Sequence, residues 1–191
     1  MRLTGGVDGG HALVSPRGDD IRPTSDRVRE ALFSILGPLD QERVLDMFAG
    51  AGTLGLEALS RGASHATFAE IHPRSLKALQ ANVERLGYTA KVELVRKPAP
   101  QVVAWLAAQQ RAFELIFLDP PYGDEALEPT VQAVANTGIL TPSGVLMAEH
   151  DRGQPLAERY PVAGGGLERV DIRQYGRTLL SFYQPIKVVT A

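Results

Sequence analysis

Short apolar runs and amphipathic segments alternate along most of this chain. Five runs, rich in branched and aromatic residues, have the length and pattern of strands buried on both faces of a sheet; they cover residues 44–48, 65–71, 92–95, 115–118 and 145–149. Apolar side chains at three- and four-residue spacing predict helices in the other segments, over residues 25–36, 54–60, 73–86, 98–110 and 127–134. This alternation is typical of a parallel α/β sheet.

The two ends of the chain depart from this alternation. Residues 169–175 and 178–184 alternate around Gly176-Arg177, which predicts an antiparallel hairpin, whereas the polar and glycine-rich residues 152–166 predict an exposed connection. At the other end, two short strand-like pieces around a glycine-rich turn predict a β-hairpin extension over residues 1–20. The complete pattern predicts a doubly wound, seven-stranded, mostly parallel Rossmann-like sheet in a domain of residues 21–191.

One strand stops abruptly at Asp119-Pro120-Pro121-Tyr122. Because proline lacks an N–H and has a fixed φ, the chain must leave the sheet after Asp119, at the edge where open α/β sheets bind ligands. The Asp119 carboxylate and the Pro120 carbonyl can accept hydrogen bonds, and Tyr122 offers a ring on which a planar base can stack. These groups suit an exocyclic amine of a nucleobase. An ordinary aspartate turn at the end of a strand is the alternative interpretation.

A glycine-rich turn follows the strand at residues 44–48 and opens a helix, as in nucleotide-cofactor sites. Its glycines satisfy the pattern G-x-G-x-x-G at Gly50, Gly52 and Gly55, so NAD is one candidate. Glu70 ends the next strand and suits ribose hydroxyls in either a dinucleotide or an adenosine cofactor. Asp46 precedes the glycines and would repel a pyrophosphate, but not the ammonium or sulfonium group of S-adenosylmethionine. The charge therefore favours S-adenosylmethionine.

Four arginines lie at or just before the start of the first predicted helix: Arg17, Arg22, Arg27 and Arg29. Thr24 or Ser25 can cap this helix. A helix amino terminus with arginines around it suits a phosphate group. This pattern predicts an RNA contact. The alternative is a solvated face in which the arginines pair with Asp26 and Glu30.

The composition of the 191-residue chain is that of a soluble globular protein, with 44% hydrophobic and 22% charged residues. The absence of cysteine excludes disulfides, thiolate metal sites and a cysteine nucleophile. No signal-like segment and no long apolar run are present, which predicts a cytoplasmic protein. The net charge of −2 means that a polyanionic partner must be bound by a local patch.

These motifs resemble the class I S-adenosylmethionine-dependent methyltransferases with a D-P-P-Y motif. More narrowly, they resemble bacterial enzymes that methylate N2 of a guanine in 16S ribosomal RNA. The resemblance spans residues 2–184 and rests on four blocks: Arg22-Pro23-Thr24 with residues 26–33, residues 45–52 continuing through 60–63, Asp119 to Tyr122, and Tyr175-Gly176. The first block, with its spacing to the second, is the most specific, since many methyltransferases share the second and third.

The resemblance implies a role for each matching residue. The implied S-adenosylmethionine site consists of Asp46, Phe48, Gly50, Gly52, Thr53, Glu70 and Ile71. The implied catalytic set, which holds a base flipped out of its stack, consists of Asp119, Pro120, Pro121 and Tyr122. The implied RNA-binding set consists of Arg17, Arg22, Thr24, Arg27 and Arg29. The expected partner is ribosomal RNA, within an assembling small-subunit particle, and the expected protein is a monomer without metal or membrane association.

The sequence departs from the family at one position and leaves three alternatives open. Where related enzymes place an Asp or Asn against the cofactor adenine, this chain has Lys97-Pro98-Ala99. An NAD-dependent oxidoreductase would leave Asp119 to Tyr122 unexplained. Methylation of adenine N6, or of another guanine in RNA or DNA, stays open because two acceptors facing an NH₂ group fit either base. A non-catalytic RNA-binding protein is disfavoured by the intact Asp119 and glycine-rich turn.

Overall fold

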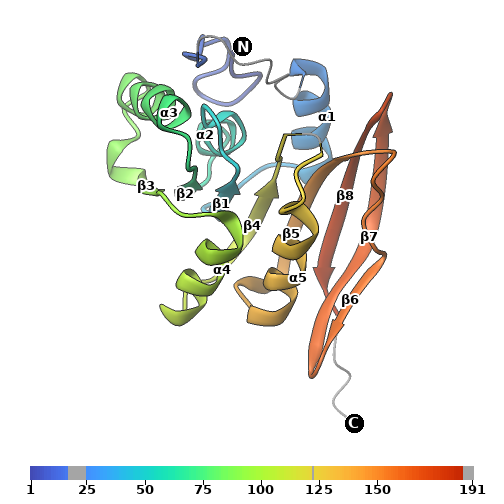
Figure 1. The fold of residues 1–191 in the computed structure, drawn as a ribbon. Coiled ribbons are helices and arrows are strands. Elements are labelled where there is room, and N and C mark those ends of the chain that lie inside the picture. Colours follow the sequence, from blue (N-terminus) through green and yellow to red (C-terminus); the bar gives the residue numbers. More distant parts are fainter. Residues whose placement is uncertain (17–24, 122, 187–191) are drawn as a thin grey trace. The chain divides into compact units, whose positions relative to one another are not determined.

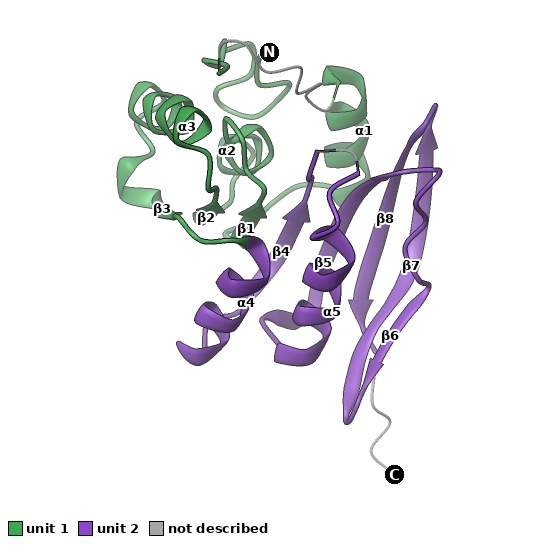
Figure 2. Cartoon of the chain, in the orientation of Figure 1, with its two compact units in different colours: residues 1–98 green, residues 99–191 purple. Residues whose placement is uncertain are grey.

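The computed structural model describes residues 1–16, 25–121 and 123–186. The chain forms two compact units, Met1–Pro98 and Ala99–Ala191 (Figure 2), and each is described by itself.

The first unit is a small parallel sheet with helices packed on it (Figure 1). Its strands lie in the order β3-β2-β1, with both pairs parallel. Its elements are α1 (Asp26–Leu36), β1 (Arg43–Met47), α2 (Thr53–Ser60), β2 (His65–Ala69), α3 (Pro73–Arg85), the short 3₁₀ helix η1 (Thr89–Lys91) and β3 (Val92–Val95). Val44, Leu45 and Met47 of β1 are fully buried, as the continuous apolar run predicts for a strand covered on both faces.

The N-terminal segment packs against the helices of the first unit. Arg2 and Ala12 form an antiparallel bridge, flanked by the Leu3 N–H to His11 carbonyl bond of 3.0 Å. The predicted hairpin is therefore an antiparallel pairing with one bridge, and residues 1–16 contain no regular strand. The predicted domain boundary after residue 20 lies outside the described residues, so the division into residues 1–20 and 21–191 stays a prediction.

The second unit contains a larger mixed sheet in the order β4-β5-β8-β7-β6. The pair β4–β5 is parallel, and the pairs β5–β8, β7–β8 and β6–β7 are antiparallel. Its elements are α4 (Ala99–Ala108), β4 (Phe113–Leu118), α5 (Leu127–Thr137), β5 (Leu140–Asp151), β6 (Arg159–Val162), β7 (Gly165–Tyr175) and β8 (Thr178–Pro185). All helices and strands predicted in the alternating part of the chain are present.

The predicted count of seven strands is wrong, because the described residues contain eight. The additional strand is β6, which lies in residues 152–166, where an exposed connection was expected. Tyr160 of β6 is opposite Leu167 of β7, and both are almost completely buried. Three of the strand pairs within the units are antiparallel, so the sheet is mixed rather than mostly parallel.

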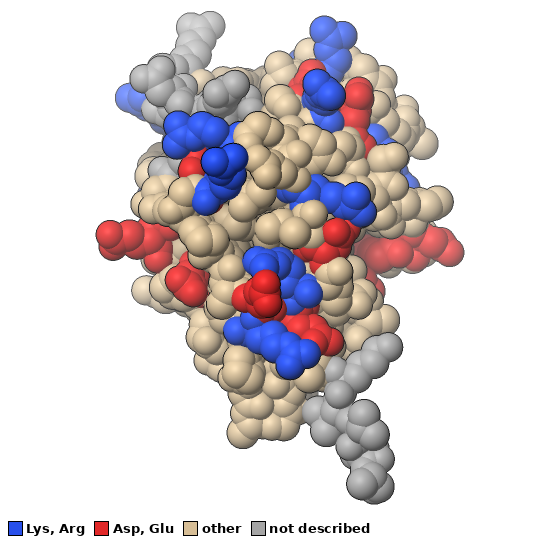
Figure 3. All heavy atoms as spheres, turned by 90° about the vertical axis from the view of Figure 1, so that its right-hand side faces the viewer, with Lys and Arg blue, Asp and Glu red and all other residues tan. Residues whose placement is uncertain are grey.

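Charges of both signs lie side by side on the outer strands of the second unit. Arg159 pairs with Glu168, Arg169 with Glu158, and Arg173 with Asp171, at 2.8–3.1 Å. Figure 3, which views the side where β7 lies, shows basic and acidic side chains interspersed there. These paired arginines do not form the local basic patch that a polyanion would require. Among the described residues, no helix has the length and apolar character needed to cross a membrane.

Candidate active site

The glycine-rich turn of the first unit joins β1 to α2 in a tight conformation. Gly52, the N-cap of α2, has φ 83°, and a Cβ built on it would lie 2.3 Å from Leu79 Cδ1. A Cβ on Gly55 would lie 2.4 Å from the Phe68 ring. Glycine is therefore favoured at Gly52 by its backbone conformation and its close approach to Leu79 of α3, and at Gly55 by the close packing of α2 on Phe68 of β2.

Asp46 lies at the end of β1, and its carboxylate binds the amino terminus of α2. The side chain is 2% exposed, and Oδ2 accepts a hydrogen bond of 2.9 Å from the Gly55 N–H. A carboxylate is stabilised at a helix amino terminus by the free N–H groups and the helix dipole. In dinucleotide enzymes the pyrophosphate binds at this helix terminus. A carboxylate on one of its amides therefore disfavours NAD.

Glu70 joins the end of β2 to the glycine-rich turn. Its Oε2 accepts a hydrogen bond of 2.8 Å from the Gly50 N–H, and its Oε1 accepts bonds of 2.7 Å from the Ile71 and His72 N–H groups. These bonds occupy three of about four acceptor positions on a carboxylate. The side chain is 7% exposed, and one further acceptor position on Oε2 can receive a hydroxyl.

Three other predicted cofactor residues lie at the ends of β1 and β2 or at the start of α2. Phe48 is half-buried, with a φ of 62° that is uncommon for a residue with a Cβ. The Thr53 hydroxyl donates to the thioether sulfur of Met1 at 2.8 Å. Ile71 is 44% exposed, next to Glu70, and presents an apolar surface at the carboxyl end of β2.

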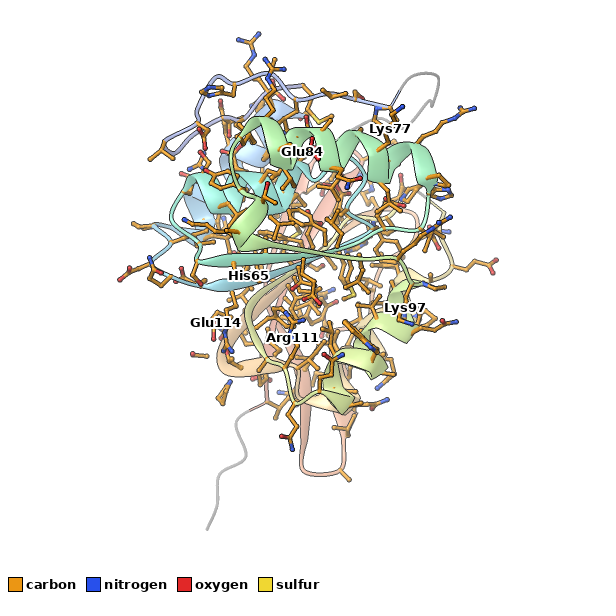
Figure 4. The ribbon with its side chains drawn as sticks, turned by 90° about the vertical axis from the view of Figure 1, so that its left-hand side faces the viewer. His65, Lys77, Glu84, Lys97, Arg111 and Glu114 are labelled. Carbon is orange, nitrogen blue, oxygen red and sulfur yellow. The ribbon has the colours of Figure 1, made fainter. Side chains whose placement is uncertain are left out.

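Lys97 follows β3 as an exposed side chain (Figure 4), so the departure from the family pattern remains at this position.

The second unit positions the acceptor motif at the end of β4. The strand ends at Leu118, as predicted. Asp119 is half-buried, Pro120 is buried and Pro121 is exposed, and the Pro121 carbonyl accepts a bond from the Asp124 N–H at 3.1 Å. Tyr122 lies outside the described residues, so its stacking role stays a prediction.

A cavity of about 630 Å³ opens beside this motif, entirely within the second unit. Its lining includes Pro120 and Pro121, together with Glu149 and His150 from β5 and Tyr160 from β6. The last three were not among the predicted site residues. Glu149 and His150 lie at the carboxyl end of β5, the strand paired with β4, and this position is the signal that would have identified them.

His150 is held as a neutral ring in one tautomer. Nδ1 faces the carbonyls of Gln154 at 3.1 Å and Asp151 at 3.3 Å, so Nδ1 carries the proton, and Nε2 accepts from the Ser181 hydroxyl at 2.9 Å. Burial lowers the pKa of His150, because desolvation penalises the charged form. The ring therefore serves as a fixed wall of the cavity rather than as a cation for phosphate.

The predicted RNA-binding arginines have different positions. Arg27 is exposed on α1, whereas Arg29 is fully buried and donates to the Arg2 carbonyl and to Asp26, at 2.9 Å for the latter. The prediction that Arg29 contacts RNA directly is therefore wrong. Its guanidinium is buried and links the N-terminal segment to α1. Ser25 caps α1, accepting from the Val28 N–H at 3.3 Å. Arg17, Arg22 and Thr24 lie outside the described residues.

Comparison with known proteins relates the chain to ribosomal RNA methyltransferases. YlbH of Bacillus subtilis, which carries a provisional rRNA methyltransferase name, is 34% identical over 185 residues, covering 96% of this chain and 98% of YlbH. Ribosomal RNA small subunit methyltransferase D of Escherichia coli K12 is 35% identical over 152 residues, covering 79% and 75%. The solved structure of a hypothetical protein, TTHA0928 of Thermus thermophilus, has a TM-score of 0.81 at 28% identity, covering 96% and 99%.

The fold and these relatives define a Rossmann-like methyltransferase. The chain belongs to the family described as Conserved hypothetical protein 95, whose model matches residues 1–184. The resemblance to small-subunit ribosomal RNA methyltransferases is thereby confirmed at the level of the family.

Proposed function

We propose that this protein transfers a methyl group from S-adenosylmethionine to the exocyclic N2 amine of a guanine in 16S ribosomal RNA. The observation that carries the cofactor assignment is the Asp46 carboxylate on the Gly55 N–H. It occupies a helix terminus that a pyrophosphate would need, and it provides negative charge for the ammonium or sulfonium group of S-adenosylmethionine. The RNA substrate is supported by the names of the relatives.

The residues of the first unit fit this cofactor. Glu70 would bind a ribose hydroxyl through the remaining acceptor position on Oε2, and the three amides on its carboxylate fix its orientation. Ile71 would place its exposed apolar side chain against the adenine. Gly50 and Gly52 would allow the backbone to approach the cofactor closely.

The acceptor motif would orient the amine for attack. When bound, S-adenosylmethionine would supply an electrophilic methyl carbon; the guanine N2 would form a bond to this carbon as its bond to sulfur breaks, and S-adenosylhomocysteine would be the other product. The lone pair of an aromatic amine is delocalised into the ring. Hydrogen bonds from its two protons to Asp119 and the Pro120 carbonyl would favour the pyramidal geometry needed for attack. The surplus proton on nitrogen can leave to solvent after transfer, so no strong base is required.

The names of the relatives support ribosomal RNA as the partner, and the remainder of the setting is proposed beyond them. The protein would act in the cytoplasm as a monomer, on ribosomal RNA within an assembling small-subunit particle, without a metal ion. Arg27, exposed at the start of α1, would contribute to the RNA contact.

Methyl transfer to ribosomal RNA tests this proposal. We expect tritium from labelled S-adenosylmethionine to enter small-subunit particles or their deproteinised RNA, and nucleoside analysis to identify N2-methylguanosine. DNA and large-subunit RNA are the control substrates. Label found in N6-methyladenosine, or no transfer to any RNA, would contradict the proposed reaction.

Ligand-induced stabilisation tests the cofactor separately. A ligand at 100 times its dissociation constant stabilises the folded state by ~2.7 kcal/mol, a shift in melting temperature of roughly 5–10 °C for a chain of this size. We expect S-adenosylhomocysteine to give this shift and NAD to give none, because Asp46 occupies the helix terminus. The Asp46→Ala variant should lose most of the shift. Stabilisation by NAD alone would refute the assignment.

A further inference from the structure

The cavity beside the acceptor motif has the composition of a site for a planar base. Its walls combine apolar residues, such as Pro120, Leu127, Leu156 and Tyr160, with polar and acidic ones, such as Asp124, Glu149, His150 and Asp151. Ligand cavities of several hundred Å³ with apolar walls and a few polar groups are typical of small-molecule sites. The volume of about 630 Å³ is sufficient for a nucleoside.

Glu149 is the buried carboxylate of this lining. It is 5% exposed, whereas Glu125 and Glu128, which also line the cavity, are exposed to solvent. A carboxylate offers about four acceptor positions and no donor when ionised. Glu149 can therefore bind a ligand N–H in addition to any protein partner.

The strand register places Glu149 next to the catalytic motif. β4 and β5 are parallel, and Leu118 is opposite Ala148. Glu149 follows Ala148 within β5, and Asp119 is the first residue after β4, so a continuation of this register by one residue would bring them to the same level and the same face. Neighbouring strands are about 4.8 Å apart. A base whose amine is held by Asp119 and the Pro120 carbonyl would thus have Glu149 at an adjacent position on its edge.

Guanine is the one common base in which an N–H group adjoins the exocyclic amine. Its N2 lies between N1–H, a donor, and N3, an acceptor. The adenine N6 amine lies between N1 and N7, and the cytosine N4 amine lies next to N3, all of which are acceptors. An ionised carboxylate attracts a donor at that position and repels a lone pair.

We propose that Glu149 is the specificity-determining residue that accepts the N1–H of guanine. The inference rests on the proposed function and extends it, since the amine acceptors of Asp119 and Pro120 do not by themselves distinguish guanine from adenine. Glu149 supplies the missing discrimination through a hydrogen bond that only guanine can donate.

The test compares two bases at the nucleotide mapped in the transfer assay. One RNA carries guanine there, and the other carries 2-aminopurine, which keeps the N2 amine but has an acceptor at N1. We expect single-turnover methylation by the unaltered protein to be about 10- to 100-fold faster on guanine, the effect of one hydrogen bond to a charged group. In Glu149→Gln the side-chain amide can donate to N1 of 2-aminopurine, so this preference should fall to near unity or reverse.

Glu84→Gln is the matched control, because it removes the same charge from an exposed position on α3 that is not part of the cavity lining. It should keep the preference of the unaltered protein. S-adenosylhomocysteine binding and the melting temperature verify that each variant is folded. The comparison of guanine with 2-aminopurine in the unaltered protein does not depend on either variant.

Equal rates on the two bases in the unaltered protein would overturn the assignment of Glu149, as would an equal loss on both bases in Glu149→Gln. In either case N2-methylguanosine would still be formed and the proposed function would stand. If the mapped product is N6-methyladenosine, or if no RNA is methylated, the proposed function itself fails and the assignment of Glu149 fails with it.

Discussion

Replacing Asp119 by Asn should lower the rate of methyl transfer by about 100-fold, equivalent to ~2.7 kcal/mol of activation free energy. Asp119 follows directly after β4, whose last residue, Leu118, is opposite Ala148 of β5. Its carboxylate is proposed to accept a proton of the target amine, and an amide would replace one acceptor oxygen with a donor that repels the N–H group. The loss should appear in the single-turnover rate at saturating RNA and cofactor.

The matched control is Asp124→Asn. Asp124 is exposed in the loop between β4 and α5, and its Oδ1 accepts a hydrogen bond of 2.8 Å from the Ala126 N–H, which the Oδ1 of an Asn side chain can also accept. This variant should transfer methyl groups within a few-fold of the unaltered rate. S-adenosylhomocysteine should bind both variants normally, because its proposed contacts lie in the first unit. An Asp119→Asn protein that is fully active would show that the amine is oriented by other groups.

The alternating part of the fold could be predicted because it depends on local pattern. Apolar runs buried on both faces and helices with one apolar face have characteristic periods, and each occurs where it was expected. β6 could not be predicted in this way. It has four residues, contains a proline and buries only Tyr160, so it has no alternating pattern of its own. Its pairing with β7 becomes apparent only in the folded unit.

The cofactor side of the site was also accessible from the sequence, because Asp46 and Glu70 follow directly from the pattern of strands and glycines; Glu70 binds the Gly50 amide in the glycine-rich turn and Asp46 binds the Gly55 amide in the first turn of α2. Which charged side chains are buried, and with which partners, could not be predicted from the sequence. Arg29 belongs to a buried face of α1 that also contains Leu32 and Phe33, at three- and four-residue spacing. An arginine on an apolar face indicates a buried ion pair, but its partner, Glu57, lies on another helix. Glu149 was missed for a similar reason, since its proximity to Asp119 depends on which strands pair.

Removing the Glu57 carboxylate should destabilise the first unit by about 3–5 kcal/mol, the usual effect of breaking a buried ion pair. The Glu57 and Arg29 side chains are both fully buried, with Arg29 Nε 3.4 Å from Glu57 Oε2. Arg29 Nε and Nη1 have no hydrogen-bond partner among the described residues. The Glu57 charge is therefore a principal compensation for the buried guanidinium. In Glu57→Gln the Arg29 guanidinium would remain buried without the negative charge of Glu57.

Glu57 also anchors the N-terminal segment. Its Oε2 accepts from the Thr4 N–H at 2.7 Å, and its Oε1 accepts from the Thr4 hydroxyl and from Arg61 Nε, both at 2.8 Å. A Gln side chain has one acceptor oxygen where the carboxylate has two, so at least one of these bonds is lost. Limited proteolysis within residues 5–10 should therefore accelerate along with the loss of stability.

Chemical denaturation of the full chain, with a probe in the first unit, measures the change in the free energy of unfolding. Glu168→Gln is the control, because its pair with Arg159 is exposed, at 34% and 70%, and such pairs contribute about 0–1 kcal/mol. Replacing both partners, as in Glu57→Leu with Arg29→Met, should recover part of the stability, since the buried guanidinium is removed with its carboxylate and only the partly exposed Arg61 and Thr4 lose their acceptor. A loss below about 1 kcal/mol in Glu57→Gln, or a double variant as unstable as the sum of the single ones, would show that Arg29 does not depend on Glu57.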